Sequence, residues 1–151
     1  MQKDNIEFKK GFDFIGVTVT FLCHDGKGNF VLAKRGANAR DENGKWDTGG
    51  GALEFNDTVE QTLKQEIAQE YCTDVIDFEF LGYRDVHREN QGRKTHWIAL
   101  DFKVLVNPDK VKIGEPHKFD DIGWFTLDNM PENLHSQLPI ALRLYNNKLR
   151  T

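Results

Sequence analysis

The sequence predicts an α/β fold, because strand-like segments surround one amphipathic helical segment and a second helical segment lies near the C-terminus. The strand-like segments are rich in β-branched and aromatic residues, and polar or glycine-containing turns separate them. They cover residues 14–23, 30–34, 78–86 and 95–106, with turns at 25–29 and 89–92, a further strand within 115–125 and a last helix at about 136–146. At 151 residues, the chain is expected to form a single domain over residues 1–151.

The main helix is predicted over residues 57–70, which contain neither Pro nor Gly. Asn56 or Asp57 is expected to cap its start by accepting a hydrogen bond from a free backbone N–H. Apolar residues recur at four-residue spacing along this segment, at Val59, Leu63, Ile67 and Tyr71. This spacing places them in one stripe on one side of the helix.

Two carboxylates lie one turn apart on the same helix. Glu66 and Glu70 have i, i+4 spacing, so their side chains share one face, with Cβ atoms roughly 5–6 Å apart. Two like charges at this spacing repel each other, and a bound divalent cation would turn that repulsion into attraction. Because such pairs also occur on solvated helix surfaces, the spacing alone leaves both interpretations open.

A run of three glycines, Gly49, Gly50 and Gly51, precedes the helix. Glycines let the backbone approach a ligand closely and allow positive φ angles, although the same run would also suit a simple tight turn. A glycine turn that leads directly into an acidic helix favours a ligand-binding role over either feature alone.

From Gly50 to Cys72, the chain resembles the signature of the Nudix hydrolase family, which includes the MutT-like enzymes. The signature is G-x5-E-x7-R-E-U-x-E-E-x-G-U, where U is a bulky apolar residue. The matching positions are Gly51, Glu66, Ile67 and Glu70, with Asp57 as a conservative replacement of Glu. The non-conservative departures are Gln65 for Arg, Gln69 for Glu and Cys72 for the last Gly, so the box is degenerate. The likeness spans nearly all of the chain through its order of strands, glycine turn and helices.

The resemblance implies a mixed β-sheet sandwiched between α-helices, and attack by water on a nucleoside diphosphate linked to another group. Mg²⁺ or Mn²⁺ is the implied cofactor, held by oxygen ligands. The implied metal positions are Glu66, Glu70 and Gln69, where Gln69 offers a neutral amide in place of a carboxylate. The implied catalytic residues are Glu66, Glu70 and Glu115, with Asp120 and Asp121 as alternatives to Glu115 and a solvated loop as the alternative role for all three late residues.

The two glutamines in the box are themselves one turn apart. Gln65 and Gln69 occupy the positions at which the family's Arg and Glu can form an ion pair. We hypothesise that a hydrogen bond between the two amides replaces this pair and supports Glu66 and Glu70.

Further residues are candidates for substrate binding because of their chemistry and their place near the box. Arginine binds phosphate with two parallel hydrogen bonds, and tryptophan can stack on a base. The candidates are Arg35, Trp46, Gly50, Gly51, Arg84 and His96. Surface salt bridges are the alternative role of the arginines, and packing or an exposed position is that of Trp46 and His96. Two other tryptophans, Trp97 and Trp124, are expected in the core.

The expected activity is metal-dependent pyrophosphohydrolysis of a small nucleotide, such as a modified nucleoside triphosphate. A nucleotide-sugar hydrolase and a non-catalytic nucleotide-binding or sensor module are the alternatives. The net charge of −4 argues against a polymeric nucleic acid as partner. The composition and the two cysteines predict a cytoplasmic protein without a membrane span or signal segment. A homodimer remains an alternative to a monomer, because homodimers are common among similar proteins.

Overall fold

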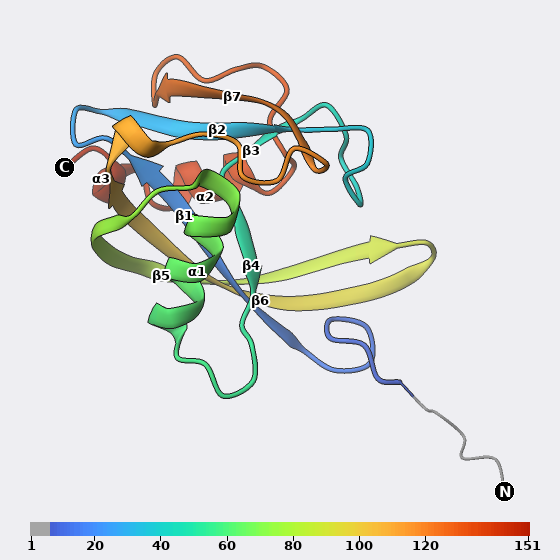
Figure 1. Cartoon of the computed structure of the whole chain (residues 1–151). Coiled ribbons are helices and arrows are strands. Elements are labelled where there is room, and N and C mark those ends of the chain that lie inside the picture. Colours follow the sequence, from blue (N-terminus) through green and yellow to red (C-terminus); the bar gives the residue numbers. More distant parts are fainter. Residues whose placement is uncertain (1–6) are drawn as a thin grey trace, which may run out of the picture.

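A mixed seven-stranded β-sheet forms the middle layer of the protein in the computed structural model, which describes residues 7–151 (Figure 1). The strands are β1 Gly16–His24, β2 Asn29–Arg35, β3 Trp46–Asp47, β4 Gly50–Ala52, β5 Val75–Asn90, β6 Arg93–Val106 and β7 Phe119–Thr126. The helices are α1 Val59–Tyr71, α2 Leu138–Leu144 and α3 Asn146–Leu149, with a short 3-10 helix, η1, at Pro108–Lys110.

The sheet is mixed because β1 and β6 run parallel, whereas the other neighbouring strands are antiparallel. Along the main path the strand order is β3-β2-β1-β6-β5, and β4 pairs with β1 while β7 pairs with β2. The parallel pairing brings the first strand of the chain next to a strand that begins 69 residues after the end of β1, at Arg93. The glycine-containing strand β4 also pairs with β1, close to the centre of the fold.

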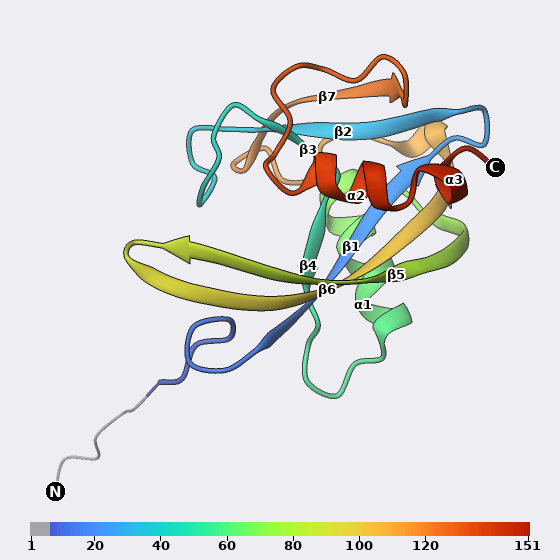
Figure 2. The ribbon, with the colours of Figure 1, turned by 180° about the vertical axis from the view of Figure 1, so that it is seen from behind.

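Helix α1 covers one face of the sheet, and α2 and α3 cover the other (Figures 1 and 2). Neighbouring side chains of β1 contribute to the hydrophobic cores on both faces of the sheet. Phe21 packs with Leu63 and Ile67 of α1, whereas Leu22 packs with Ala141 of α2. Side chains of successive strand residues point to opposite faces, so one strand serves two cores. The predicted sandwich of a mixed sheet between helices is confirmed.

Strands β5 and β6 form a long hairpin that extends away from the rest of the fold (Figure 1). Its two-residue turn consists of Gln91 and Gly92, both with positive φ angles of 52° and 78°. This backbone conformation matches the twist of a tight hairpin and fixes the pairing register of its two strands. Both strands are longer than the sequence predicts, because they also include residues 75–77, 87–90 and 93–94. The added residues next to the turn, 87–90 and 93–94, all carry polar side chains.

Several local expectations are wrong. The last helix divides into α2 and α3 because the backbone at Tyr145 leaves the helical conformation. Trp124 is 37% exposed, since β7 pairs only with β2 and turns this side chain outward. Trp97 is partly buried and fills the space beside Gly11 and Gly16, where an added Cβ would overlap its ring.

None of the helices within residues 7–151 has the length and apolar character needed to cross a membrane. Cys23 is buried, Cys72 is partly buried, and both are free thiols.

Candidate active site

Helix α1 begins two residues later than expected, at Val59, after a capping box made by Thr58. The Thr58 hydroxyl accepts a hydrogen bond from the Gln61 backbone N–H, and the Gln61 side chain accepts one from the Thr58 N–H. The predicted caps Asn56 and Asp57 therefore lie before the helix, because Thr58 satisfies its free donors with a reciprocal pair. The helix then buries Leu63, Ile67 and Tyr71 against the sheet.

The face of α1 next to this apolar stripe carries Glu66 and Glu70 towards the glycine strand β4. A Cβ added at Gly51 would collide with the Glu66 carboxyl group, and one added at Gly49 would lie 2.5 Å from Oε2 of Glu70. The backbone N–H of Gly50 donates a hydrogen bond to the same oxygen over 3.3 Å. The glycines are required at this point because the two carboxylates occupy the space that side chains would fill.

Glu115 reaches the same region through a loop that covers the C-terminal end of α1. The Gly114 N–H donates to the carbonyl of Glu70 over 2.9 Å, and the Lys112 N–H donates to that of Tyr71 over 3.1 Å. Any Cβ at Gly114 would overlap the Gln69 carbonyl, so the loop needs glycine to approach the helix this closely. These contacts fix the start of the segment that carries Glu115.

The three carboxylates place excess negative charge in a poorly solvated region. The pKa of Glu70 lies well above its usual range, first because the side chain is buried and then because Glu66, Glu115 and Asp47 repel its charge. Burial, followed by the charge of Glu115, also raises the pKa of Glu66. Lys118 acts in the opposite direction and forms an ion pair with Glu115 at 3.4 Å. One lysine does not balance this group of acids.

This arrangement fits a divalent cation. Glu70 is 6% exposed, and among the described residues it has a backbone N–H partner but no ion pair. A buried carboxylate without a counter-charge is costly, and a hard cation with oxygen ligands would supply that charge. Glu66 and Glu70 would hold such an ion, with Glu115 beside them.

Gln69, the third predicted metal position, is exposed on α1. Gln65 is exposed as well, and within residues 7–151 no hydrogen bond joins the two amides. The hypothesis that these glutamines form a supporting pair is therefore wrong, because both side chains extend into solvent.

A cleft of about 700 Å³ begins at Glu70 and the glycine strand. It runs across the face of the sheet covered by α2 and is bounded by the inner side of the β5–β6 hairpin. Near the carboxylates its walls are polar and carry Arg35, Arg40, Asp47, His117 and Lys118. Farther along, the walls include the apolar side chains of Phe12, Leu22, Val86, Trp97 and Leu138.

The cleft also contains a buried carboxylate that the sequence did not single out, Asp101, which lies across Thr20 of β1 from Gly50. Asp101 has no exposed surface and binds the Arg84 guanidinium through Nε at 2.7 Å and Nη2 at 3.0 Å. The Tyr145 hydroxyl donates to it over 2.6 Å, and the Thr20 hydroxyl donates to its other oxygen. The sequence contained one signal for this residue, because it is the only acid in the apolar strand segment 97–102. A charged residue at such a position is expected to be buried with partners.

The structure brings several predicted substrate-binding residues together in the cleft and leaves others outside it. Arg35, Gly50, Gly51 and Arg84 line the cleft. Arg35 is held there by ion pairs with Asp41 at 2.9 Å and Asp47 at 4.0 Å.

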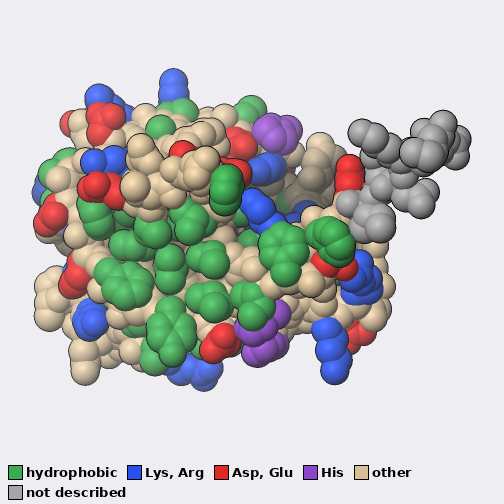
Figure 3. Space-filling view, turned by 90° about the horizontal axis from the view of Figure 1, so that it is seen from below, with side chains coloured by type: hydrophobic (Ala, Val, Ile, Leu, Met, Phe, Trp, Pro, Cys, Tyr) green, Lys and Arg blue, Asp and Glu red, His purple; other side chains and the backbone are tan. Residues whose placement is uncertain are grey.

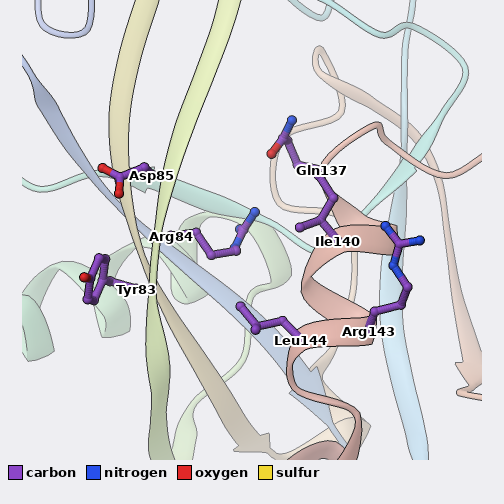
Figure 4. A pocket seen from close by; sticks show the side chains of 7 residues that line it. All are labelled: Tyr83, Arg84, Asp85, Gln137, Ile140, Arg143 and Leu144. Carbon is purple, nitrogen blue, oxygen red and sulfur yellow. The ribbon is translucent and has the colours of Figure 1, made fainter.

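Trp46 and His96 do not line the cleft. Trp46 packs edge-on against Phe125, with ring centroids 5.2 Å apart. His96 lies on the opposite face of the hairpin, because alternate residues of a strand point in opposite directions. Figure 4 shows the same alternation on β5, where Arg84 extends towards α2 while Tyr83 and Asp85 lie on the other side.

Comparison with known proteins agrees with this geometry. The NUDIX domain model matches residues 15–145. A MutT Nudix hydrolase from Burkholderia pseudomallei has a similar structure, with a TM-score of 0.75, 25% identity, and coverage of 86% of this chain and 97% of that one. A MutT protein from Methanosarcina mazei Go1 gives a TM-score of 0.74 at 23% identity, covering 91% and 96%. A comparison with curated proteins found no significant match.

Nudix proteins are acid-anhydride hydrolases that generally use divalent metal ions. Since the family model covers most of the sequence, the chain belongs to the Nudix family and is a Nudix-type hydrolase. Enzymes of this family act on small-molecule substrates.

Proposed function

We propose that this protein is a Mg²⁺- or Mn²⁺-dependent pyrophosphohydrolase acting on a nucleoside diphosphate linked to another group, in particular a small nucleotide such as a modified nucleoside triphosphate. The observation that carries the proposal is the uncompensated charge of Glu70, beside Glu66 and Glu115, at one end of a cleft. The metal would neutralise the phosphate oxygens and make the attacking water more acidic. Glu66 and Glu70 would hold it, and Glu115 would accept a proton from the water.

The polar end of the cleft supports binding of the phosphate chain. Gly50 and Gly51 line this part of the cleft, and the lack of a side chain at Gly51 lets the Glu66 carboxylate of α1 lie against the glycine strand, where the phosphate chain would bind. Arg35 and Lys118 supply positive charge on the same walls, and Arg35 is oriented by its two aspartate partners. Nε and Nη2 of Arg35 already donate to Asp41, so the remaining N–H donors of the guanidinium would bind a phosphate oxygen.

The apolar end of the cleft supports binding of the nucleoside. Phe12 and Trp97 offer aromatic surface for a base, and the volume of about 700 Å³ is in the range of small-molecule sites. Nη1 of Arg84 is buried and has no acceptor within the described part of the chain. An acceptor on the substrate would satisfy it, which favours a base or sugar with an exposed oxygen or nitrogen.

We also propose that one domain carries this activity and that the protein works in a reducing compartment such as the cytoplasm. The free thiols of Cys23 and Cys72 support the second point, because reducing compartments preserve unpaired cysteines.

The test is a hydrolysis screen of nucleoside triphosphates, modified triphosphates, nucleotide sugars and dinucleotides with Mg²⁺ or Mn²⁺. Glu66→Gln and Glu70→Gln should each abolish most turnover. Glu60→Gln is the matched control on the same helix, because Glu60 is exposed and pairs with Lys64 at 3.5 Å; its turnover should equal that of the unmodified protein.

Three outcomes would change the proposal. Turnover that survives Glu70→Gln would remove the metal assignment. A preference for nucleotide sugars would shift the substrate class to that alternative. Nucleotide binding without turnover at any metal concentration would support a non-catalytic binding module.

A further inference from the structure

A group of side chains that could ligate a metal lies on the outer face of the β5–β6 hairpin, away from the cleft. Asp85 and His87 are alternate residues of β5, and His96 belongs to β6. Their potential ligand atoms all lie within 4.8 Å of one another. The inner face of the same hairpin carries Arg84 and Trp97, which line the cleft, so the outer group belongs to a separate surface.

The hairpin register holds this group together. His87 and His96 are directly paired across the two strands, and the Gln91-Gly92 turn sets that register. The His96 N–H donates to the Gly11 carbonyl over 2.8 Å and so points away from β5. His87 and His96 therefore form a non-hydrogen-bonded pair, the position at which opposing side chains of an antiparallel ladder come closest.

The distances are close to those of a tetrahedral metal site. Nε2 of His96 lies 3.1 Å from Oδ1 of Asp85, and the rings of His87 and His96 are 4.1 Å apart between centroids. Two ligands bound to zinc at about 2.0–2.1 Å with tetrahedral geometry stand about 3.3 Å apart. Small side-chain rotations would bring the imidazole of His87 to the same centre.

The group is also accessible from solvent. The side chains of His96 and Asp85 are 33% and 52% exposed, and His87 is exposed. Figure 3 shows the molecule from below, where histidine side chains lie next to acidic and hydrophobic ones on the surface. An ion can therefore reach the group without rearrangement of the backbone.

We propose that Asp85, His87 and His96 bind a divalent transition-metal ion, with Zn²⁺ as the expected species. Imidazole nitrogen favours Zn²⁺ over Mg²⁺, which requires oxygen ligands, so this site and the carboxylates of α1 select different metals. Two imidazoles and one carboxylate leave a fourth position for water. A metal here clamps β5 to β6 on the back of the cleft wall and stabilises the hairpin.

The experiment measures Zn²⁺ binding by competition with a chromophoric chelator. It is done on the full chain carrying Glu66→Gln and Glu70→Gln, so that the carboxylates of α1 contribute little. We expect one Zn²⁺ per chain, and at least about a 100-fold loss of affinity with His87→Gln or His96→Gln, because losing a ligand exceeds the effect of losing a supporting residue. Asp85→Asn should weaken binding less, since an amide oxygen remains.

His24→Gln is the control, because His24 is a partly buried histidine at the end of β1 with its own backbone contact to Gly26. It should leave Zn²⁺ affinity unchanged. With Co²⁺ as the probe, the intense visible absorption of a four-coordinate ion should appear and should disappear in His96→Gln.

Zn²⁺ affinity that is the same in His87→Gln, His96→Gln and His24→Gln would overturn the proposal. The absence of Zn²⁺ binding in the Glu66→Gln/Glu70→Gln chain would do the same, provided that its circular dichroism spectrum is that of the folded protein. None of these experiments measures hydrolase activity, so their outcome does not depend on the proposed function.

Discussion

Two buried carboxylates, Glu70 and Asp101, line the same cleft and differ in their partners. Asp101 receives hydrogen bonds from Arg84, Tyr145 and Thr20, and the guanidinium neutralises its charge. Glu70 receives one backbone hydrogen bond, and its charged neighbours are mainly other acids. Burial is nearly complete in both, so burial alone does not separate them.

The difference shows which of the two carboxylates needs a counter-charge from a bound ion. Burial opposes the charge of Arg84, but its hydrogen bonds to Asp101 outweigh this effect and raise the pKa of the guanidinium. Burial, and then the bond to Asp101, raises the pKa of Tyr145, which remains a proton donor. The charge of Asp101 is therefore balanced within the protein, and among the described residues only Nη1 of Arg84 in this group lacks an acceptor. Within residues 7–151 the Glu70 group lacks a counter-charge, and this deficit is the reason why we propose it as the metal site.

The largest expected effect comes from removing the charge of Asp101. Asp101→Asn removes the charge that compensates Arg84 and should lower the free energy of unfolding by about 3–5 kcal/mol, as measured by denaturant titration. Asp128→Asn is the control, because Asp128 forms an exposed pair with Arg150, and its stability should hardly change. If the two variants were equally stable, Asp101 would not have the structural role inferred here.

The corresponding change at Glu70 should affect activity. Glu70→Gln should reduce kcat by roughly 10²–10³-fold, the scale seen when one preorganised electrostatic group is lost from an active site. Mg²⁺ should raise the melting temperature of the unmodified protein and leave that of Glu70→Gln almost unchanged, because the variant lacks a principal ligand. An equal Mg²⁺ response in both proteins would show that the ion binds elsewhere.

The raised pKa of Glu70 also predicts a pH dependence without metal. Its pKa in the folded state lies above the ordinary value of 4.5, so the folded protein binds the proton more tightly than the unfolded chain. Stability from this group is then present below pH 4.5 and is lost as the pH rises through the folded pKa.

This loss should appear in thermal melts as a difference in melting temperature between the unmodified protein and Glu70→Gln. The variant should be the more stable protein at pH 8 without metal, and the difference should shrink towards pH 4. A constant difference across that range would mean that Glu70 is not desolvated as the structure indicates.

A smaller loss of activity is expected from Gly51→Ala. The added methyl group would displace the Glu66 carboxyl, and a shift of about 1 Å at a reacting group can cost roughly 100-fold in rate. Stability should change little, because the end of the Glu66 side chain can rotate away. In a double-mutant cycle with Glu66→Gln, the two losses should be strongly non-additive, since both act through one carboxylate. Additive losses would indicate that Gly51 acts through the backbone instead.

The contrast between Glu70 and Asp101 also explains which parts of the site the sequence could predict. Glu66, Glu70 and the glycines follow one another in a short segment, so their spacing and turn chemistry were readable directly. Asp101 draws its partners from β1, β5 and the end of α2, between 17 and 81 residues away along the chain. No local pattern links residues at such separations, and only the pairing of the strands brings them together.

His96 illustrates the same limit on a smaller scale. The sequence correctly placed it beside a hairpin turn, but the side of the sheet on which it lies depends on the register. A shift by one residue would have put it into the cleft. The Gln91-Gly92 turn fixes the register that puts His96 opposite His87 on the outer face.

The smallest expected effect concerns Cys72, which stands where the family signature has glycine. Cys72 ends α1 in the left-handed conformation with φ 58°, a region in which residues with a Cβ are strained by roughly 1–2 kcal/mol. Cys72→Gly should relieve this strain at the cost of a more flexible unfolded chain, for a net gain of about 0.5–1 kcal/mol in thermal melts. Cys72→Ala is the matched control, because it removes the same sulfur but keeps the Cβ, and it should not gain stability. If both variants melted alike, the thiol contact beside Gly114 and not the backbone would determine stability at this position. In that case, packing of the Cys72 thiol would compensate for the missing glycine at the end of α1. The predicted result means instead that the end of α1, next to Glu70, retains backbone strain.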